Sequence, residues 1–292
     1  MFAKARIRCI NLEQSQQPLS RSRAMKTCSE AVLDVARNQF SQDGYCTFPS
    51  LIPSGLIDQL PLRIQSVMNG EYKTAIEPIW VTANDPDKLR IIDQSHASDP
   101  TIYELVSHPI IGQAVAAVTG ARKVQLWAAS LIYKPPGGNK TGAVGWHQDF
   151  EYFDSMFEVG PEEIITAWIA ISNVTTDAGP VTFVPGSHCW GLLKKGDLFN
   201  PDHQVSVPEG RTWSEVPAIL SPGAFSLHHS LIFHGSGANC SNAPRVGFAL
   251  HLCTEKAISR PITPNNPGYE YLRHLDDATF CPILYNEPLL SG

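Results

Sequence analysis

Apolar residues in the first 120 positions recur at the three- and four-residue spacing of amphipathic helices. Ser29 is placed to cap one such helix, which Gly44 ends. A second helix is expected after Pro53, and a third over residues 101–119, where a glycine follows as a C-cap. The pattern therefore predicts a helical region over residues 29–120.

From residue 121 the pattern changes to short runs of Val, Ile, Thr, Phe and Trp that Gly and Pro interrupt, which indicates strands joined by turns. Strands are expected at residues 123–134, 163–174, 181–184, 224–229, 231–236 and 245–254. This spacing predicts a mainly β fold, a jelly roll or double-stranded barrel. We expect one domain over residues 29–292, with a β core at 121–257 and a C-terminal segment at 258–292.

Two segments break the rhythm of strands, residues 135–145 and 197–217. The first contains four glycines and the second is polar and proline-bearing. Long loops in a compact domain often lie over a binding site. Both segments are therefore expected near the mouth of the barrel.

Composition excludes several classes of protein. Charged residues make up 17% of the 292 positions, below the typical value of about 25%, and the net charge is −6 without basic runs in the body of the chain. These values argue against a nucleic-acid partner. The longest apolar run has eight residues, far short of the roughly 20 that span a bilayer. Seven scattered cysteines without a CxxC pair favour a reducing, cytoplasmic location.

The first 28 residues are rich in Lys and Arg and lack the apolar core of a secretory signal. A disordered extension over residues 1–28 is expected, or an upstream extension with the true start near Met25. An organelle address remains an open alternative.

The sharpest local motif is the run Gly-Trp-His-Gln-Asp at residues 145–149. On an extended backbone His147 and Asp149 point to the same face, while Gln148 turns away. An imidazole and a carboxylate on one face supply two legs of the two-histidine, one-carboxylate triad that holds Fe(II). Taken alone, an HxD motif also fits a surface pair.

The run from Phe233 to Arg245 strengthens the prediction because it contains His234 and, eleven residues later, Arg245. The glycine-rich stretch between them can reverse the chain, so the strand that starts at Arg245 is expected beside the strand that ends at His234. 2-Oxoglutarate chelates iron at one end, and a guanidinium suits the carboxylate at its other end. The alternative for Arg245 is a surface ion pair.

Other histidines compete for the role of third ligand. His228 and His229 lie six and five residues before His234, but neither has an Arg at the same following interval. His188 is expected to satisfy backbone carbonyl groups. Trp127 and Trp146 fit either the core or the wall of a substrate pocket, and Gln125 is a candidate for the pocket. Residues 88–94 are expected in a surface turn, with the alternative that they reach over the barrel mouth and supply a positive group to an acidic substrate.

Residues 39–257 resemble the phytanoyl-CoA dioxygenase-like branch of the iron and 2-oxoglutarate oxygenases. Besides the residues above, the resemblance rests on the runs FSQDGY at 40–45, WIAI at 168–171, AGP at 178–180 and VPGSH at 184–188. It implies a double-stranded β-helix of the cupin-like kind with N-terminal helices. It also implies that Trp168 lines the co-substrate pocket and that Ser236 hydrogen-bonds 2-oxoglutarate beside Arg245.

The expected function follows from this resemblance together with the motifs. Fe(II) is expected on His147, Asp149 and His234, with 2-oxoglutarate and O2 as co-substrates, and the reaction is hydroxylation of a small natural-product or lipid-like molecule. Asp149 disfavours halogenation, since halogenating relatives lack this carboxylate. A metal- and 2-oxoglutarate-binding barrel without turnover and a zinc hydrolase are the alternatives.

Overall fold

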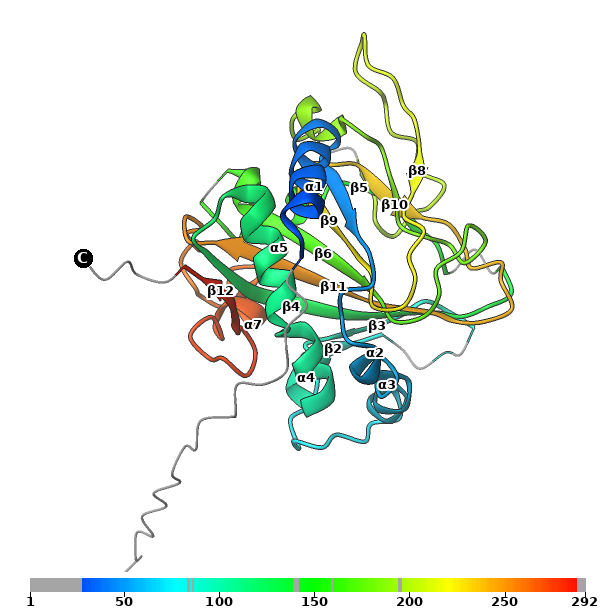
Figure 1. Ribbon diagram of the computed structural model, residues 1–292, viewed down its shortest axis with the longest axis vertical. Coiled ribbons are helices and arrows are strands. Elements are labelled where there is room, and N and C mark those ends of the chain that lie inside the picture. Colours follow the sequence, from blue (N-terminus) through cyan, green and yellow to red (C-terminus); the bar gives the residue numbers. More distant parts are fainter. Residues whose placement is uncertain are drawn as a thin grey trace, which may run out of the picture.

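Two β-sheets face each other in the computed structural model of the chain, and helices cover the outer face of the larger sheet (Figure 1). The structure describes residues 28–82, 85, 87–138, 142–158, 160–193 and 196–287. The extension expected at residues 1–28 lies outside this part of the chain, apart from Cys28.

The helices are α1 (Glu30–Asp43), α2 (Ser54–Ile57), α3 (Leu60–Met68), α4 (Pro100–Val106), α5 (Pro109–Thr119), α6 (Phe150–Phe153) and α7 (Tyr269–Leu272), with 3-10 turns at Ser95–Ser98, Pro161–Glu163 and Ser187–Trp190. The strands are β1 (Tyr45–Phe48), β2 (Trp80–Val81), β3 (Arg90–Asp93), β4 (Lys123–Lys134), β5 (Val144–His147), β6 (Ile164–Ala170), β7 (Thr182–Phe183), β8 (Val216–Pro217), β9 (Phe225–His229), β10 (His234–Ser236), β11 (Arg245–Thr254) and β12 (Ile283–Asn286).

The larger sheet has the strand order β1-β9-β6-β11-β4-β3-β2, and β12 also pairs with β4. The smaller sheet has the order β5-β10-β7-β8. The predicted mainly β, jelly-roll fold is confirmed, with the qualification that the two sheets stay open at their edges and form no closed barrel. Between β4 and β11 the chain crosses repeatedly from one sheet to the other, which brings residues far apart in sequence together between the sheets.

The two faces of the larger sheet line different regions, as the alternating side chains of β6 show. Ile165 and Ile169 pack with Val115 of α5 in the main hydrophobic core, beneath the helices. Thr166 and Trp168 lie on the opposite face and line a cavity that residues of the smaller sheet also line. Side chains two apart on a strand share a face, so each strand of this sheet contributes to both environments.

The helix expected over residues 101–119 is wrong as a single element, because the chain forms α4 and α5 with a break between them. Pro109 begins α5, and its ring disfavours helical backbone at the preceding residue. His108 is accordingly extended, with φ −64° and ψ 123°, and its side chain caps α5 by accepting the amide of Ile110. Pro109 therefore divides the single helix that the apolar periodicity predicted.

The expected surface turn at residues 88–94 is also wrong. Arg90–Asp93 form β3, which pairs with β4 in the larger sheet, and Arg90 is buried with its guanidinium donating to the carbonyl of Met68 at 2.6 Å. With β1 and β2, this strand shows that the N-terminal region is not wholly helical. None of the helices within the described ranges is long and apolar enough to cross a membrane.

Buried His96 makes stability sensitive to acid. Its Nε2 donates to the carbonyl of Phe280 at 2.8 Å, and Nδ1 has no partner. Burial lowers the pKa of His96 from 6.5 to about 4. Between these values the unfolded chain binds the proton that the folded chain excludes, so the free energy of unfolding falls by up to about 3 kcal/mol as the pH drops through this window.

Urea denaturation at several pH values between 7 and 4 measures this effect. The variant His96→Gln, whose amide has no such titration, is expected to lose less stability on acidification than the wild type. Equal losses in the two proteins would show that His96 is not responsible.

Candidate metal centre and cavity

The side chains of His147 and His234, from the smaller sheet, converge with that of Asp149, at the start of α6. Antiparallel pairing of β5 with β10 sets His147 opposite His234, with ring centroids 4.1 Å apart. Oδ1 of Asp149 lies 3.5 Å from Nε2 of each histidine. One donor atom from each residue lies within 4.8 Å of the other two, and all three side chains are buried. The three donors therefore face one point.

The backbone that delivers Asp149 differs from the sequence prediction. β5 ends at His147, and Asp149 has the helical values φ −54° and ψ −38° at the start of α6. The extended backbone predicted for Asp149 is thus wrong, although its carboxylate does converge with His147. Gln148 turns away as predicted, and its amide donates to the carbonyls of Gly191 and Leu231. These two bonds fix the corner between strand and helix.

Backbone carbonyls set the tautomer of both histidines. Nδ1 of His147 lies 2.8 Å from the carbonyl of Gly145, and Nδ1 of His234 lies 3.1 Å from the carbonyl of Ile232. A carbonyl oxygen only accepts, so Nδ1 carries the hydrogen and Nε2 of the neutral ring keeps its lone pair. Burial, followed by the proximity of His147, lowers the pKa of His234 well below its usual range. Both Nε2 atoms are therefore free to bind a cation.

The second oxygen of Asp149 is already engaged. Thr166 donates its hydroxyl to Oδ2 at 2.6 Å, and Nε2 of His228 lies 3.3 Å from the same atom. Burial alone would raise the pKa of Asp149, but His234 and its neighbouring imidazoles hold it well below the usual range. The carboxylate is thus ionised, with Oδ1 facing the two histidines. Two imidazole nitrogens and one carboxylate oxygen on one side of a site suit Fe(II).

The competing histidines have other partners. His228 contacts Asp149 from β9 and lies outside the group of three donors that the structure brings together in the described part of the chain. Nδ1 of His229 accepts the amide of Leu231 at 3.0 Å. His188 lies beside the thiol of Cys189, and its ring has a backbone hydrogen bond at Ser41, in line with the expected bond to a backbone carbonyl.

Arg245 reaches the site from the opposite sheet. Its strand, β11, pairs with β4 and β6 in the larger sheet, whereas His234 lies in the smaller sheet. The expectation that these two strands are neighbours is therefore wrong. Both residues nevertheless line one cavity of about 260 Å³ between the sheets, together with Trp168 and Ser236. The glycine-rich turn carries the chain from one sheet to the other.

The surroundings of Arg245 mark it as a receptor for an anion. Its side chain is 1% exposed, and Nε and Nη1 have no hydrogen-bond partner. The guanidinium lies 4.9 Å from the ring centroid of Trp168. Burial lowers its pKa to about 10, so it remains charged at neutral pH. Buried donors normally find partners, and a planar guanidinium binds a carboxylate through two parallel bonds.

Gly247 makes room for Trp168. A Cβ added at Gly247 would lie 2.3 Å from Cζ2 of Trp168, closer than any real contact. Gly247→Ala is therefore expected to displace the indole from beneath Arg245 and to destabilise the fold by about 1–3 kcal/mol through overpacking. Thermal unfolding measures the loss. Gly55→Ala is the matched control, because nothing lies within 4 Å of its added Cβ. Equal melting temperatures for the wild type and Gly247→Ala would contradict the packing argument.

Several residues of the site escaped the sequence analysis. Thr166 shares a strand face with Trp168, so strand alternation could have found it, and its hydroxyl lies 3.1 Å from Nδ1 of His251 on the cavity wall. Gln125, proposed for the pocket, instead donates to the carbonyls of Leu275 and Cys281. Trp127 is 1% exposed and belongs to a hydrophobic cluster.

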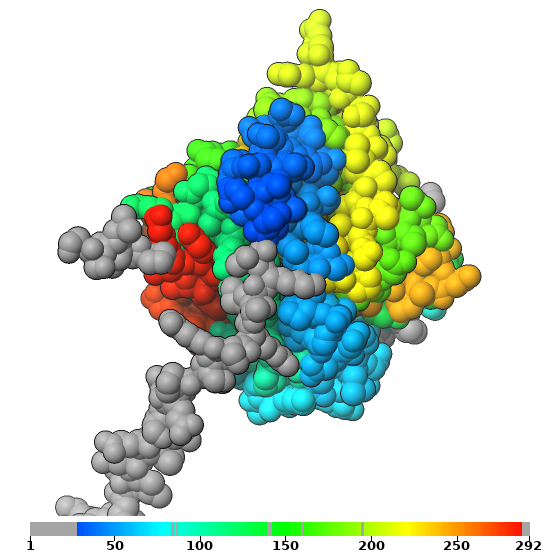
Figure 2. All heavy atoms as spheres, in the orientation of Figure 1, coloured from blue at the N-terminus to red at the C-terminus, as the bar shows by residue number. Residues whose placement is uncertain are grey.

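The loop over residues 197–217 meets the cavity only at its start. Leu198 lines the cavity, and its carbonyl accepts the amide of Gly145 at 3.0 Å. A Cβ on Gly145 would lie 2.0 Å from the carbonyl oxygen of Asp197, so glycine is required for this close approach. The tip of the loop projects away from the body of the molecule (Figure 1; yellow at the top of Figure 2), whereas Trp213 returns to pack against Trp146 and Phe233.

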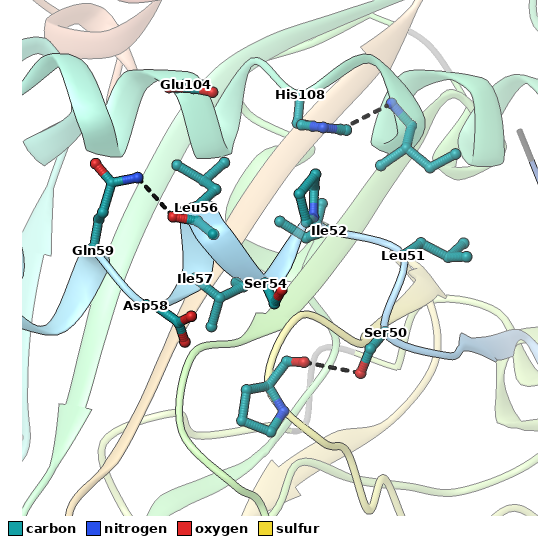
Figure 3. Close-up of a pocket in the computed structure, with 14 residues that line it drawn as sticks. Ser50, Leu51, Ile52, Ser54, Leu56, Ile57, Asp58, Gln59, Glu104 and His108 are labelled. Carbon is teal, nitrogen blue, oxygen red and sulfur yellow. Dashed lines mark hydrogen bonds between the residues drawn. The ribbon is translucent and has the colours of Figure 1, made fainter. Parts of the chain in front are cut away.

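A larger pocket of about 830 Å³ lies elsewhere, around α2, and shares no lining residue with the cavity between the sheets. Figure 3 shows two of its polar side chains bonded locally: Ser50 donates to the carbonyl of Pro222, and Gln59 donates to the carbonyl of Gly55. The three-residue group of donor atoms lies in the other cavity. The candidate metal site of this chain therefore lies between the sheets and not in the pocket around α2.

Comparison with known proteins agrees with this geometry. The sequence profile of the family described as Phytanoyl-CoA dioxygenase (PhyH) matches residues 40–247. A probable phytanoyl-CoA dioxygenase of Caenorhabditis elegans is 26% identical over 237 residues, which is 75% of this chain and 74% of that protein.

Solved structures share the fold at low sequence identity. The non-heme alpha ketoglutarate dependent epimerase SnoN from nogalamycin biosynthesis superposes with a TM-score of 0.63 at 21% identity, over 82% of this chain and 89% of that one. EctD from S. alaskensis with 2-oxoglutarate and 5-hydroxyectoine gives a TM-score of 0.60 at 20% identity, over 83% of this chain and 88% of that one.

Proposed function

The chain belongs to the phytanoyl-CoA dioxygenase family, and on that premise we propose that it is an Fe(II)- and 2-oxoglutarate-dependent dioxygenase that hydroxylates a small molecule with O2. Succinate and CO2 are the co-products of this reaction. The observation that carries the proposal is the meeting of the His147, Asp149 and His234 donors with the guanidinium of Arg245, whose Nε and Nη1 have no partner, in one buried cavity.

The residues fit the cofactor and the co-substrate on their own chemistry. The two Nε2 lone pairs of His147 and His234 and Oδ1 of Asp149 would hold Fe(II) and leave positions open on the metal. Arg245 would bind the remote carboxylate of 2-oxoglutarate, and Ser236 would add a hydrogen bond from the smaller sheet. The iron, when bound, would activate O2 as 2-oxoglutarate loses CO2.

The protein itself orients and shields the reactants. Thr166 and His228 hold one oxygen of Asp149, so that the other faces His147 and His234 and would be available to the metal. Trp168 gives the co-substrate a flat wall beneath Arg245. Burial of all three ligands excludes bulk water, which strengthens each electrostatic contact in the site.

The walls of the cavity favour a substrate with an apolar portion. Ile91, Phe153 and Leu198 line it, and Arg245 supplies its only lysine or arginine side chain among the described lining residues. A natural-product or lipid-like molecule suits such walls. SnoN and EctD also act on or bind small molecules, according to their descriptions, which supports this choice of substrate class.

Succinate formation tests the proposal against both alternatives. The protein is incubated with Fe(II), 2-oxoglutarate, O2 and a panel of apolar metabolites, and succinate is quantified. A dioxygenase releases succinate in step with product. Binding of 2-oxoglutarate without succinate for any compound would indicate a non-catalytic barrel. Zinc-dependent hydrolysis that ignores 2-oxoglutarate would indicate a hydrolase, for which the buried Arg245 has no task.

A further inference from the structure

Lys134 is a second buried cation beside the cavity, which the sequence analysis did not single out. It ends β4, directly opposite Arg245 of β11 in the antiparallel register, and its exposed fraction is 0%. Neither residue forms an ion pair with an acid in the described part of the chain. Buried charges are normally paired, so two adjacent buried basic groups are costly to charge together unless an anion joins them.

The amino group of Lys134 controls the hydroxyl of Ser236. Nζ lies 2.5 Å from the carbonyl of Gly237, 3.4 Å from the carbonyl of Ser236 and 2.7 Å from Oγ of Ser236. The two carbonyls only accept, so two N–H groups of Lys134 point at them. The third position on Nζ faces the hydroxyl. An ammonium donates there, whereas a neutral amine accepts the hydroxyl proton through its lone pair.

The surroundings favour the neutral amine while the cavity holds no anion. Burial, with a smaller contribution from Arg245, lowers the pKa of Lys134 to about 6. Besides Arg245, the strands that pair with β4 carry Arg90 and Asp93 on β3, His251 and Cys253 on β11 and Tyr285 on β12, and β10 carries His234. Arg90 donates to the carbonyl of Met68, and His234 faces Asp149. A carboxylate bound beside Arg245 would favour the ammonium.

We propose that Lys134 is a positioning residue that takes up one proton when the remote carboxylate of 2-oxoglutarate binds, and thereby releases the Ser236 hydroxyl to donate to that carboxylate. The proton comes from solvent and forms an N–H bond at the Nζ lone pair. That N–H then donates to Oγ of Ser236, and the Ser236 O–H rotates toward the co-substrate. The identity of the anion rests on the proposed function.

Calorimetric titration of 2-oxoglutarate into the anaerobic Fe(II) protein tests this inference. In buffers of different ionisation enthalpy at pH 7.5, the heat is expected to report uptake of about one proton per 2-oxoglutarate bound. Between pH about 6 and the raised pKa of the complex, the affinity is expected to fall by up to about tenfold per pH unit as the pH rises. Below pH about 6 the affinity should be independent of this group.

Substitutions test whether Lys134 is the group that takes up the proton when 2-oxoglutarate binds. Lys134→Met is expected to bind 2-oxoglutarate about tenfold more weakly at neutral pH and to lose both the uptake and its pH dependence. Ser236→Ala should also bind weakly but keep the uptake. Lys123→Met, at the other end of β4, is the matched control and should behave as the wild type.

The outcomes separate the two claims. If the wild type does not bind 2-oxoglutarate, the proposed function fails. If the wild type binds it without proton uptake, or if Lys134→Met retains the uptake, the proposed function stands and the role of Lys134 is wrong. If Lys134→Met does not fold, the uptake by the wild type and by Ser236→Ala still decides the question.

Discussion

Asp149→Ala is expected to abolish succinate formation and to weaken binding of Fe(II) by more than about a hundredfold. The substitution removes the only anionic donor of the three, and losing a hydrogen-bond partner of a metal ligand alone costs about ten- to hundredfold. Thr166 and His228 lose their shared acceptor as well. Iron is measured in the anaerobically loaded protein after desalting, and succinate under saturating Fe(II).

The control for this experiment is Asp58→Ala, which removes an exposed carboxylate after α2. It should keep iron and activity. The Asp149→Ala protein should remain folded, because its side chain faces a cavity and supports no packed core. Wild-type succinate formation by an iron-loaded Asp149→Ala protein would remove Asp149 from the metal site.

Arg245→Lys is expected to weaken 2-oxoglutarate binding by about ten- to a hundredfold and to leave the iron content unchanged. A guanidinium offers a carboxylate two parallel donors, while an ammonium offers a point charge. Loss of one charge-assisted hydrogen bond costs about 1.5–3 kcal/mol, which corresponds to this change in affinity. Arg245→Ala should be weaker still.

The measurement is the charge-transfer absorption band that forms when 2-oxoglutarate chelates Fe(II) under anaerobic conditions. Arg273→Lys is the matched control, since this arginine is exposed and pairs with Glu270 on the surface. An unchanged midpoint in both Arg245 variants would mean that another group anchors the co-substrate, and would reopen the zinc-hydrolase alternative.

The identity of the site residues could be predicted from the sequence, whereas the pairing of the strands that carry them could not. The β11 limits, Arg245–Thr254, agree with the sequence, because an unbroken run of strand-forming residues starts after Pro244. The strand predicted to lie beside β11, the one that contains His234, is not its neighbour in the structure. Local turn signals describe how the chain reverses, whereas the pairing of Arg245 with Lys134 joins segments far apart in sequence. Such long-range contacts depend on the whole sheet and leave no local signature.

The same distinction explains the details of the metal centre. His147 and His234 were identified from their motifs, and their placement opposite each other follows from strand pairing. The helical backbone of Asp149 depends on Gln148, whose amide is held by carbonyls of two distant segments. Sequence spacing therefore indicated which residues meet, while the tertiary contacts determine how they meet.

The most direct test is an anaerobic crystal structure with Fe(II) and 2-oxoglutarate. We predict that the metal lies about 2.0–2.2 Å from Nε2 of His147, Oδ1 of Asp149 and Nε2 of His234, with the remote carboxylate of 2-oxoglutarate on Arg245 and Ser236. Iron bound by His228 or His229 in place of His234, or a co-substrate carboxylate that does not contact Arg245, would contradict the account.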